Sequence, residues 1–131
     1  MSQENVEIVK GLVDAVNRQD WDNVFKDQTP GCEWDISRSE SPLSGVYRLD
    51  QFRGALVEFA GSWEAMRVEP HEYIEAGDLV VMHGTTRLKG REGIEVSATG
   101  AFVFAIRDGA IERVSLYQER QEALEAVGLS E

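Results

Sequence analysis

The stretch that decides the fold is residues 78–118, DLVVMHGTTRLKGREGIEVSATGAFVFAIRDGAIERVSLYQ. Its best-defined part is Arg107-Asp108-Gly109-Ala110, where Asp-Gly separates two apolar runs. Asp-Gly favours a type I′ turn, because both central residues of that turn have positive φ. We therefore expect a hairpin formed by residues 94–106 and 110–118, preceded by a third strand at 79–88.

A two-residue turn also sets the pairing of the hairpin. It predicts the cross-strand pairs Arg107–Ala110, Ala105–Glu112, Val103–Val114 and Ala101–Leu116. One face then carries Ala101, Val103, Ala105, Val114, Leu116 and Gln118. The other face carries Phe102, Phe104, Ile106, Ile111, Arg113, Ser115 and Tyr117. Both faces hold apolar side chains, so we expect one to cover the rest of the chain and the other to meet a second copy.

The composition is that of one domain spanning residues 1–131, with 42% apolar residues and a net charge of −11. The excess of acidic residues argues against nucleic acid and anionic membranes as partners. No apolar run approaches 18 residues and no secretory segment is visible, so we expect a cytoplasmic protein outside the membrane. The single cysteine, Cys32, excludes an internal disulfide.

Helical patterns precede the three strands. Val6, Val9, Val13 and Val16 recur at helical spacing, and this helix is expected to end near Arg18. A second apolar stripe at Phe52, Leu56, Phe59 and Trp63 predicts a central helix. Residues 32–37 alternate as a strand, residues 66–74 form a strand interrupted at Pro70, and residues 119–127 form a last helix. Helices followed by a run of antiparallel strands indicate an α+β fold.

This order of elements resembles the SnoaL-like domains of the nuclear transport factor 2-like superfamily, which also contains ketosteroid isomerases. The residues that carry the resemblance are the N-terminal helix ending in Asn17-Arg18-Gln19-Asp20, Cys32-Glu33-Trp34, Ser44-Gly45-Val46-Tyr47-Arg48, Ala76-Gly77-Asp78, and Arg107 to Ile111. The resemblance implies a cone-shaped roll, in which a curved antiparallel sheet wraps over the N-terminal and central helices. It also implies a pocket on the concave side and a dimer interface on the convex side.

Matching the Asp-Gly turn to the equivalent turn of ketosteroid isomerase implies that Ala101, Val114, Leu116 and Gln118 face the pocket, in agreement with the pairing above. The full set of expected pocket-lining residues is Leu12, Val16, Trp34, Phe59, Trp63, Met82, Ala101, Val103, Val114, Leu116 and Gln118. The convex face, with Phe102, Phe104 and Tyr117, is expected to form a homodimer. Apolar alternation along residues 79–88 favours Met82, Gly84 and Thr86 facing the pocket.

The chemistry of ketosteroid isomerase requires a carboxylate base and an oxyanion hole made by a Tyr and a protonated Asp. The resemblance aligns that Tyr with Leu12 and that Asp with Ala101, neither of which can donate a hydrogen bond. Loss of even one such donor typically costs on the order of 100-fold in rate. The sequence therefore argues against steroid isomerisation by that mechanism.

Two residues are candidates for a catalytic base. The loop after residues 32–37 has one residue more than the matching loop of the isomerases. If the extra residue is placed late in that loop, Asp35 matches the position of the isomerase base, and if it is placed early, Trp34 does. Strand alternation favours Trp34 facing in. His83 lies in a predicted strand and is either a pocket base or a histidine of the convex interface.

The sequence predicts no metal site and no cofactor, because His71 and His83 lack a supporting cluster and no phosphate-binding glycine loop is present. Three functions remain open. The first is a mostly apolar pocket that binds a small organic molecule. The second is a cofactor-independent isomerase, cyclase or hydrolase using Asp35 or His83. The third is a non-catalytic dimeric interaction module.

Overall fold

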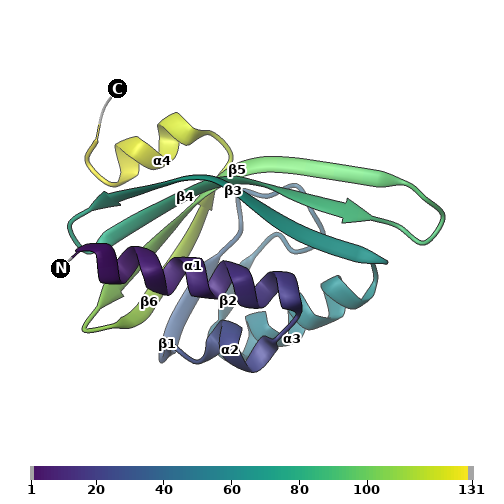
Figure 1. Cartoon of the computed structure of the whole chain (residues 1–131), viewed down its shortest axis with the longest axis horizontal. Helices are drawn as coiled ribbons and strands as arrows, with labels where there is room; N and C mark the ends of the chain where they lie inside the picture. Colours follow the sequence, from purple (N-terminus) through teal and green to yellow (C-terminus); the bar gives the residue numbers. More distant parts are fainter. Residues whose placement is uncertain (1, 130–131) are drawn as a thin grey trace.

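The structure is a computed structural model and describes residues 2–129 (Figure 1). The helices are α1 (Ser2–Arg18), α2 (Trp21–Phe25), α3 (Leu49–Gly61) and α4 (Arg120–Ala126). The strands are β1 (Gln28–Asp35), β2 (Val46–Arg48), β3 (Ala65–Ala76), β4 (Leu79–Lys89), β5 (Glu95–Arg107) and β6 (Ala110–Tyr117). In this part of the chain no helix is both long enough and apolar enough to cross a membrane.

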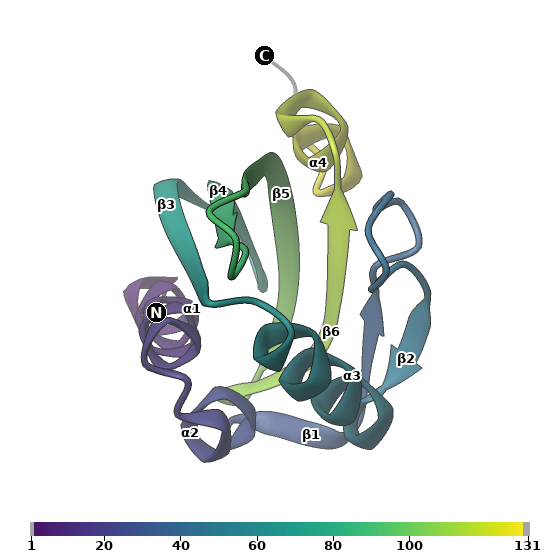
Figure 2. The same cartoon turned by 90° about the vertical axis from the view of Figure 1, so that its right-hand side faces the viewer.

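The six strands form one curved sheet in the order β2-β1-β6-β5-β4-β3. All neighbouring strands are antiparallel except β1 and β6, which run parallel, so the sheet is mixed rather than wholly antiparallel. Figure 2 shows the sheet bending from β3 round to β2 without closing, with α1 and α3 on its inner side and α4 outside. The α+β prediction of a curved sheet wrapped over the N-terminal and central helices is confirmed.

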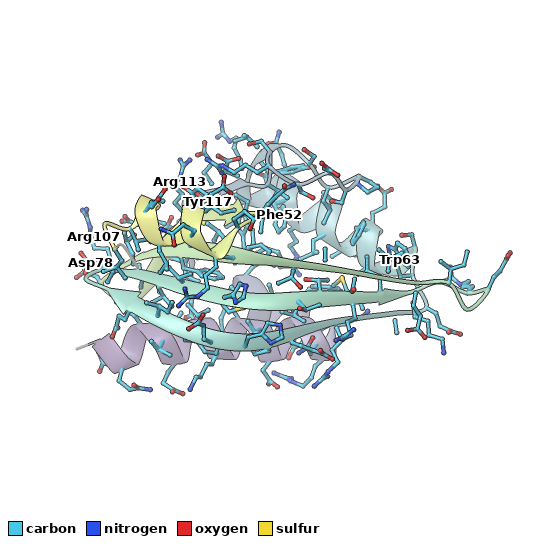
Figure 3. All side chains as sticks on the ribbon, turned by 90° about the horizontal axis from the view of Figure 1, so that it is seen from above. Phe52, Trp63, Asp78, Arg107, Arg113 and Tyr117 are labelled. Atoms are coloured by element: carbon cyan, nitrogen blue, oxygen red, sulfur yellow. The ribbon has the colours of Figure 1, made fainter. Side chains whose placement is uncertain are left out.

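The turn between β5 and β6 has the predicted type. Asp108 and Gly109 have φ values of 52° and 80°, and Arg107 pairs with Ala110. A second turn lies beside it, because the Ile106 N–H donates to the Asp78 carbonyl at 2.9 Å. Figure 3 shows Asp78 and Arg107 together at one end of the sheet. Two strand connections are therefore tied together at this end.

The predicted pairing beyond the turn is wrong by one residue. Ile106 pairs with Ile111, but Ala105 then pairs with Arg113, so Glu112 is the extra residue of a β-bulge. The observed pairs that follow are Phe104–Val114, Val103–Ser115, Phe102–Leu116 and Ala101–Tyr117. Because side chains alternate between the two faces of a strand, this shift of one residue puts Phe102 and Phe104, rather than Ala101 and Val103, on the same face as Val114 and Leu116.

The bulge decides which residues meet the interior. Phe104 is only 2% exposed and belongs to the main core, with Val114 on the same face. Ala101 and Val103 lie on the convex face instead, where they form a smaller core with Ala123 of α4. The predicted convex location of Phe102 and Phe104 is therefore wrong. The homodimer itself stays a prediction.

The first helix ends at the predicted residue and packs as predicted. α1 ends at Arg18, and Gln19 follows with a φ of 56°, a left-handed conformation typical of a residue just beyond a helix. Its stripe of Val9, Val13 and Val16 is buried in the main core. Asn17 anchors the helix to β3, because its amide donates to the Val68 carbonyl at 2.9 Å and accepts from the Val68 N–H at 2.7 Å.

The pairing of β3 with β4 is irregular at one point. The register between the two strands shifts between Pro70 and Glu72, which leaves His71 as an extra residue. Opposite this shift lies Gly84, where an added Cβ would be 2.6 Å from the Glu69 carbonyl oxygen. The two backbones can approach this closely because Gly84 has no side chain. The interruption predicted at Pro70 therefore appears as this register shift, in a strand at the edge of the sheet.

Candidate functional site

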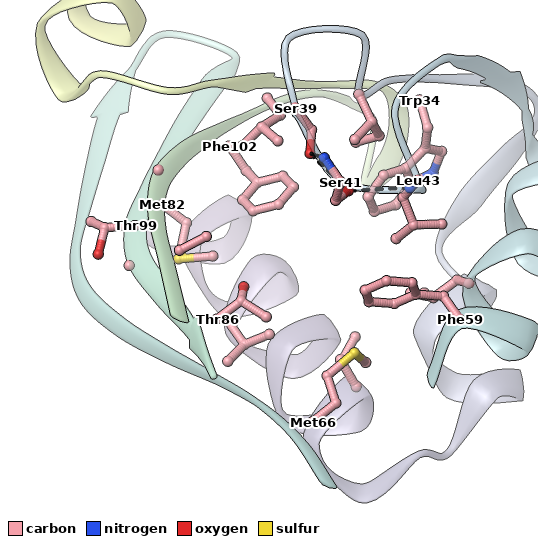
Figure 4. A pocket seen from close by; sticks show the side chains of 18 of the residues that line it. Trp34, Ser39, Ser41, Leu43, Phe59, Met66, Met82, Thr86, Thr99 and Phe102 are labelled. Atoms are coloured by element: carbon pink, nitrogen blue, oxygen red, sulfur yellow. Dashed lines mark hydrogen bonds between the residues drawn. The ribbon is translucent and has the colours of Figure 1, made fainter. Parts of the chain in front are cut away.

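A cavity of about 580 Å³ lies between the concave face of the sheet and helices α1 and α3. Its size falls within the range of about 300–1,000 Å³ typical of small-molecule sites. Figure 4 shows its walls converging from the sheet, from α3 and from the loop after β1. The structure therefore has room for a ligand at the place where the elements meet.

Most of the wall is apolar. The helices contribute Leu12, Val13, Val16, Leu56 and Phe59, and the sheet contributes Met66, Val68, Met82, Leu88, Phe102, Phe104 and Leu116. Figure 4 shows Phe59, Met66, Met82 and Phe102 around the central space. Methionine side chains adapt their shape easily, so two of these four groups can adjust to a ligand.

Trp34 forms a rigid part of the wall. Its ring stacks on Phe52 with centroids 4.2 Å apart and planes 9° from parallel. Its indole N–H donates to Gln28 Oε1 at 2.7 Å, and Gln28 in turn donates to the Val24 carbonyl at 3.1 Å. Because the only polar group of the indole is already bonded, Trp34 offers the cavity an apolar surface.

One hydroxyl points into the apolar part of the cavity. Figure 4 shows the Thr86 oxygen directed toward the central space. Within residues 2–129 this hydroxyl has no hydrogen-bond partner. A threonine hydroxyl can both donate and accept, so Thr86 is a polar contact available to a bound molecule.

The rim of the cavity is polar. Ser39, Glu40, Ser41, Gln118 and Glu119 line it, and Glu40, Gln118 and Glu119 are exposed. Among the described residues that line the cavity, the titratable ones are Glu40 and Glu119. Within residues 2–129, the titratable side chains of the cavity wall therefore lie at its rim rather than in its interior.

The loop at the rim is held by its own hydrogen bonds. The Ser39 and Ser41 hydroxyl oxygens lie 2.8 Å apart, and the Leu43 N–H donates to Ser41 Oγ at 3.1 Å. The Tyr47 hydroxyl donates to the Leu43 carbonyl at 2.9 Å. These bonds fix the position of Glu40, which lies between the two serines.

A second hollow adjoins the cavity. Its wall includes Tyr47 and Trp63, and it shares Leu43 and Phe59 with the cavity. α3 ends at Gly61, so Trp63 lies beyond the helix and not in the wall of the main cavity. Leu43 and Phe59 therefore form the partition between the two spaces.

The structure places seven of the eleven expected lining residues on the cavity surface. These are Leu12, Val16, Trp34, Phe59, Met82, Leu116 and Gln118. Val114 faces the same side but is fully buried in the core. Ala101 and Val103 face α4 because of the bulge at Glu112.

Asp35 lies away from the cavity, as the alternation with Trp34 suggested. Its carboxylate accepts hydrogen bonds from the Ser37 hydroxyl at 2.6 Å and the Ser37 N–H at 3.1 Å. Arg38 and Arg113 lie 3.5 and 3.6 Å from its second oxygen. The Ser37 hydroxyl bond, followed by smaller effects that include both arginines, lowers the pKa of Asp35. The group is therefore an ionised structural carboxylate rather than a base in the pocket.

His83 also lies away from the cavity. Its Nδ1 is 3.8 Å from Glu72 Oε1, and its ring centroid is 5.6 Å from that of His71. Glu72 is also paired with Arg120 of α4. His83 therefore belongs to a polar cluster that joins β3, β4 and α4 on the convex side. Within residues 2–129 no group of three or more His, Cys, Asp or Glu side chains has the arrangement of a metal site.

Sequence reasoning missed several lining residues. Phe102 and Phe104 were assigned to the other face, and no feature of the sequence marks the bulge that reverses them. Glu40, Ser39 and Ser41 lie in a polar loop. A loop has no periodic pattern of apolar residues, so the sequence did not indicate that their side chains face the cavity. Thr86 was predicted to face inward, and the structure places it there.

Comparison with solved structures finds the same fold at low sequence identity. An NTF2-like protein of unknown function from Burkholderia pseudomallei has a TM-score of 0.77 and 22% identity, covering 98% of this chain and 99% of that one. TerC, crystallised with polyporic acid, has a TM-score of 0.73 and 22% identity, covering 95% and 98%. A hypothetical protein with a ketosteroid isomerase-like fold from Catenulispora acidiphila, in complex with trimethylamine, has a TM-score of 0.74 and 15% identity, covering 94% and 93%.

A comparison with curated protein sequences found no significant match. The model of the SnoaL-like domain family, in contrast, matches residues 9–114. This match spans α1 to β6 and so includes most elements that surround the cavity. The chain belongs to the SnoaL-like domain family.

Proposed function

We propose that this protein binds a small, predominantly apolar organic molecule in the cavity. The observation that carries the proposal is a cavity of about 580 Å³ whose walls are mostly apolar, with the Thr86 hydroxyl on its inner surface. Burial of apolar surface contributes about 25 cal/mol per Å², so such walls favour a ligand with little polar surface. Solved proteins of this fold that contain polyporic acid or trimethylamine support the proposal at the level of the fold.

The proposal is for binding rather than for acid–base catalysis inside the cavity. A general base must lie within hydrogen-bond reach of the proton that it removes. Asp35 is held by Ser37 and two arginines outside the cavity, and His83 lies on the convex face. Among the residues that the structure describes, the interior walls contain no titratable side chain that could replace either group.

A pair of matched variants tests the proposal. Thr86→Phe fills the cavity from β4, whereas Ser97→Phe adds the same ring on β5, at an exposed position opposite Arg87 and away from the cavity. Each protein is titrated with naphthalene and indole, and binding is followed by NMR shifts of the methionine methyl groups.

We expect the wild type and Ser97→Phe to bind with similar affinity, with the largest shifts at Met66 and Met82. Thr86→Phe should bind at least tenfold more weakly, because its ring occupies the volume of the ligand. The proposal would be rejected if neither compound perturbed these methyl groups, or if both phenylalanine variants bound as tightly as the wild type.

A further inference from the structure

The charged groups at the cavity are all of one sign. Among the described residues that line it, Glu40 and Glu119 are charged, and no lysine, arginine or histidine is present. Both carboxylates lie at the exposed rim. A ligand whose apolar body fills the interior therefore meets negative charge where its end emerges.

Arg38, the arginine nearest to Glu40 in the sequence, does not compensate the negative charge of the rim. The Arg38 guanidinium lies 4.2 Å from the centre of the Tyr117 ring and 3.5 Å from Asp35 Oδ2. It also donates to the Leu116 carbonyl at 3.2 Å. These contacts commit Arg38 to the outer side of β1 and β6, so it is not available to an anion in the cavity.

Glu40 is the rim carboxylate available to a ligand. Within residues 2–129 its side chain makes no hydrogen bond or ion pair, while the serines on both sides of it are bonded within the loop. The Gln118 amide N–H donates to the Arg38 carbonyl, which leaves its own carbonyl oxygen as an acceptor at the rim. Hydrogen-bond acceptors of the rim, on Glu40 and Gln118, are thus available to a ligand, whereas several hydrogen-bond donors of the rim are already bonded within the protein.

We propose that the cavity selects molecules whose apolar body ends in an amine or another hydrogen-bond donor, and rejects those ending in a carboxylate, with Glu40 as the residue that sets this preference. The inference rests on the proposed binding function and specifies its ligand class. An exposed ion pair changes affinity by about 1.5- to 5-fold. Attraction of a cation and repulsion of an anion together give a preference of about tenfold between otherwise identical ligands.

Three naphthalene derivatives test the inference, because they differ only at the end of an ethyl chain: a primary amine, an alcohol and a carboxylate. Their dissociation constants are measured at pH 7 and low salt for the wild type, Glu40→Gln and Glu92→Gln. Glu92 is exposed in the turn between β4 and β5 and outside the cavity, so its variant changes the net charge equally without changing the rim.

We expect the wild type and Glu92→Gln to bind the amine about tenfold more tightly than the carboxylate, with the alcohol between them. Glu40→Gln should reduce this ratio to about threefold and leave the affinity for the alcohol within twofold. High salt should reduce the ratio in the wild type. If all three compounds bind the wild type equally, the charge selection is wrong but the binding function stands. The same conclusion follows if Glu92→Gln lowers the ratio as much as Glu40→Gln. If none of the three binds, both proposals fail.

Discussion

Trp34 provides the sharpest test of how the cavity wall is built, through the substitution Trp34→Phe. The phenyl ring can keep the stack on Phe52, but it removes the N–H that bonds Gln28 Oε1 at 2.7 Å. Trp34 and Gln28 are only 5% and 8% exposed, so water cannot readily replace the lost donor. The substitution therefore leaves a buried acceptor without its partner.

The expected cost has two parts. The smaller ring buries about 40 Å² less apolar surface, which is worth about 1 kcal/mol. An unpaired buried acceptor costs about 1–3 kcal/mol. Together they lower the free energy of unfolding by about 2–4 kcal/mol, a large part of the roughly 5–15 kcal/mol typical of a domain. Urea unfolding followed by circular dichroism at 222 nm measures this difference.

Two further variants separate the two parts. Trp63→Phe makes the same substitution at a partly exposed tryptophan whose indole N–H has no hydrogen bond within residues 2–129, and it should cost less than about 1 kcal/mol. Adding Gln28→Met to Trp34→Phe removes the orphaned acceptor, so the double variant should be about 1–2 kcal/mol more stable than the sum of the single effects predicts. A cost below about 1 kcal/mol for Trp34→Phe, or strictly additive effects, would refute this account of the wall.

Three other predictions concern the sheet. Burial, followed by the charges of two nearby glutamates, raises the pKa of the Cys32 thiol to about 12. Native protein at pH 8 should therefore not react with a thiol reagent, and the extent of labelling should follow the unfolded fraction in urea. Rapid labelling of Cys32 without urea would contradict this prediction. The pKa of Asp35 is lowered in the folded state, so its stabilisation is complete above the unfolded pKa of about 3.9 and is lost as the pH falls through the folded value. Asp35→Asn should therefore lower the free energy of unfolding by about 1–2 kcal/mol at pH 7 and by much less near pH 3, and an equal effect at both pH values would count against the Ser37 and arginine contacts. Gly84→Ala should lower the free energy of unfolding in urea by about 1–3 kcal/mol, because its Cβ would lie 2.6 Å from a backbone oxygen of β3. Gly31→Ala is the control, because its Cβ would have no atom within 4 Å, and it should cost less than about 0.5 kcal/mol. Equal costs for the two variants would be inconsistent with the close approach of β3 and β4 at Gly84.

The sequence was informative wherever local chemistry decides structure. Asp108-Gly109 predicted the turn and its first pair, because few residues other than glycine, asparagine and aspartate accept its positive φ values. Alternation predicted that Trp34 faces inward and Asp35 outward, and that Met82 and Thr86 face the cavity. These predictions depend only on the two-residue period of a strand.

The sequence did not indicate the β-bulge between β5 and β6, where one extra residue changes which side chains of β5 share a face with those of β6. Glu112 is an ordinary exposed glutamate between Ile111 and Arg113, and nothing in these residue types distinguishes a bulge from regular pairing. The pairing predicted without this bulge placed Phe102 and Phe104 on the convex side and Ala101 and Val103 on the concave side. The apolar residues of the last helix were likewise visible, but their sequence did not indicate that α4 covers the convex face.

A crystal structure of the protein soaked with naphthalene tests the central claim most directly. The account predicts density for the bicyclic ring inside the cavity, between Phe59 and Phe102 and against Met66 and Met82. Density only outside the sheet, or a cavity in which these four side chains pack against one another with no space between them, would contradict it.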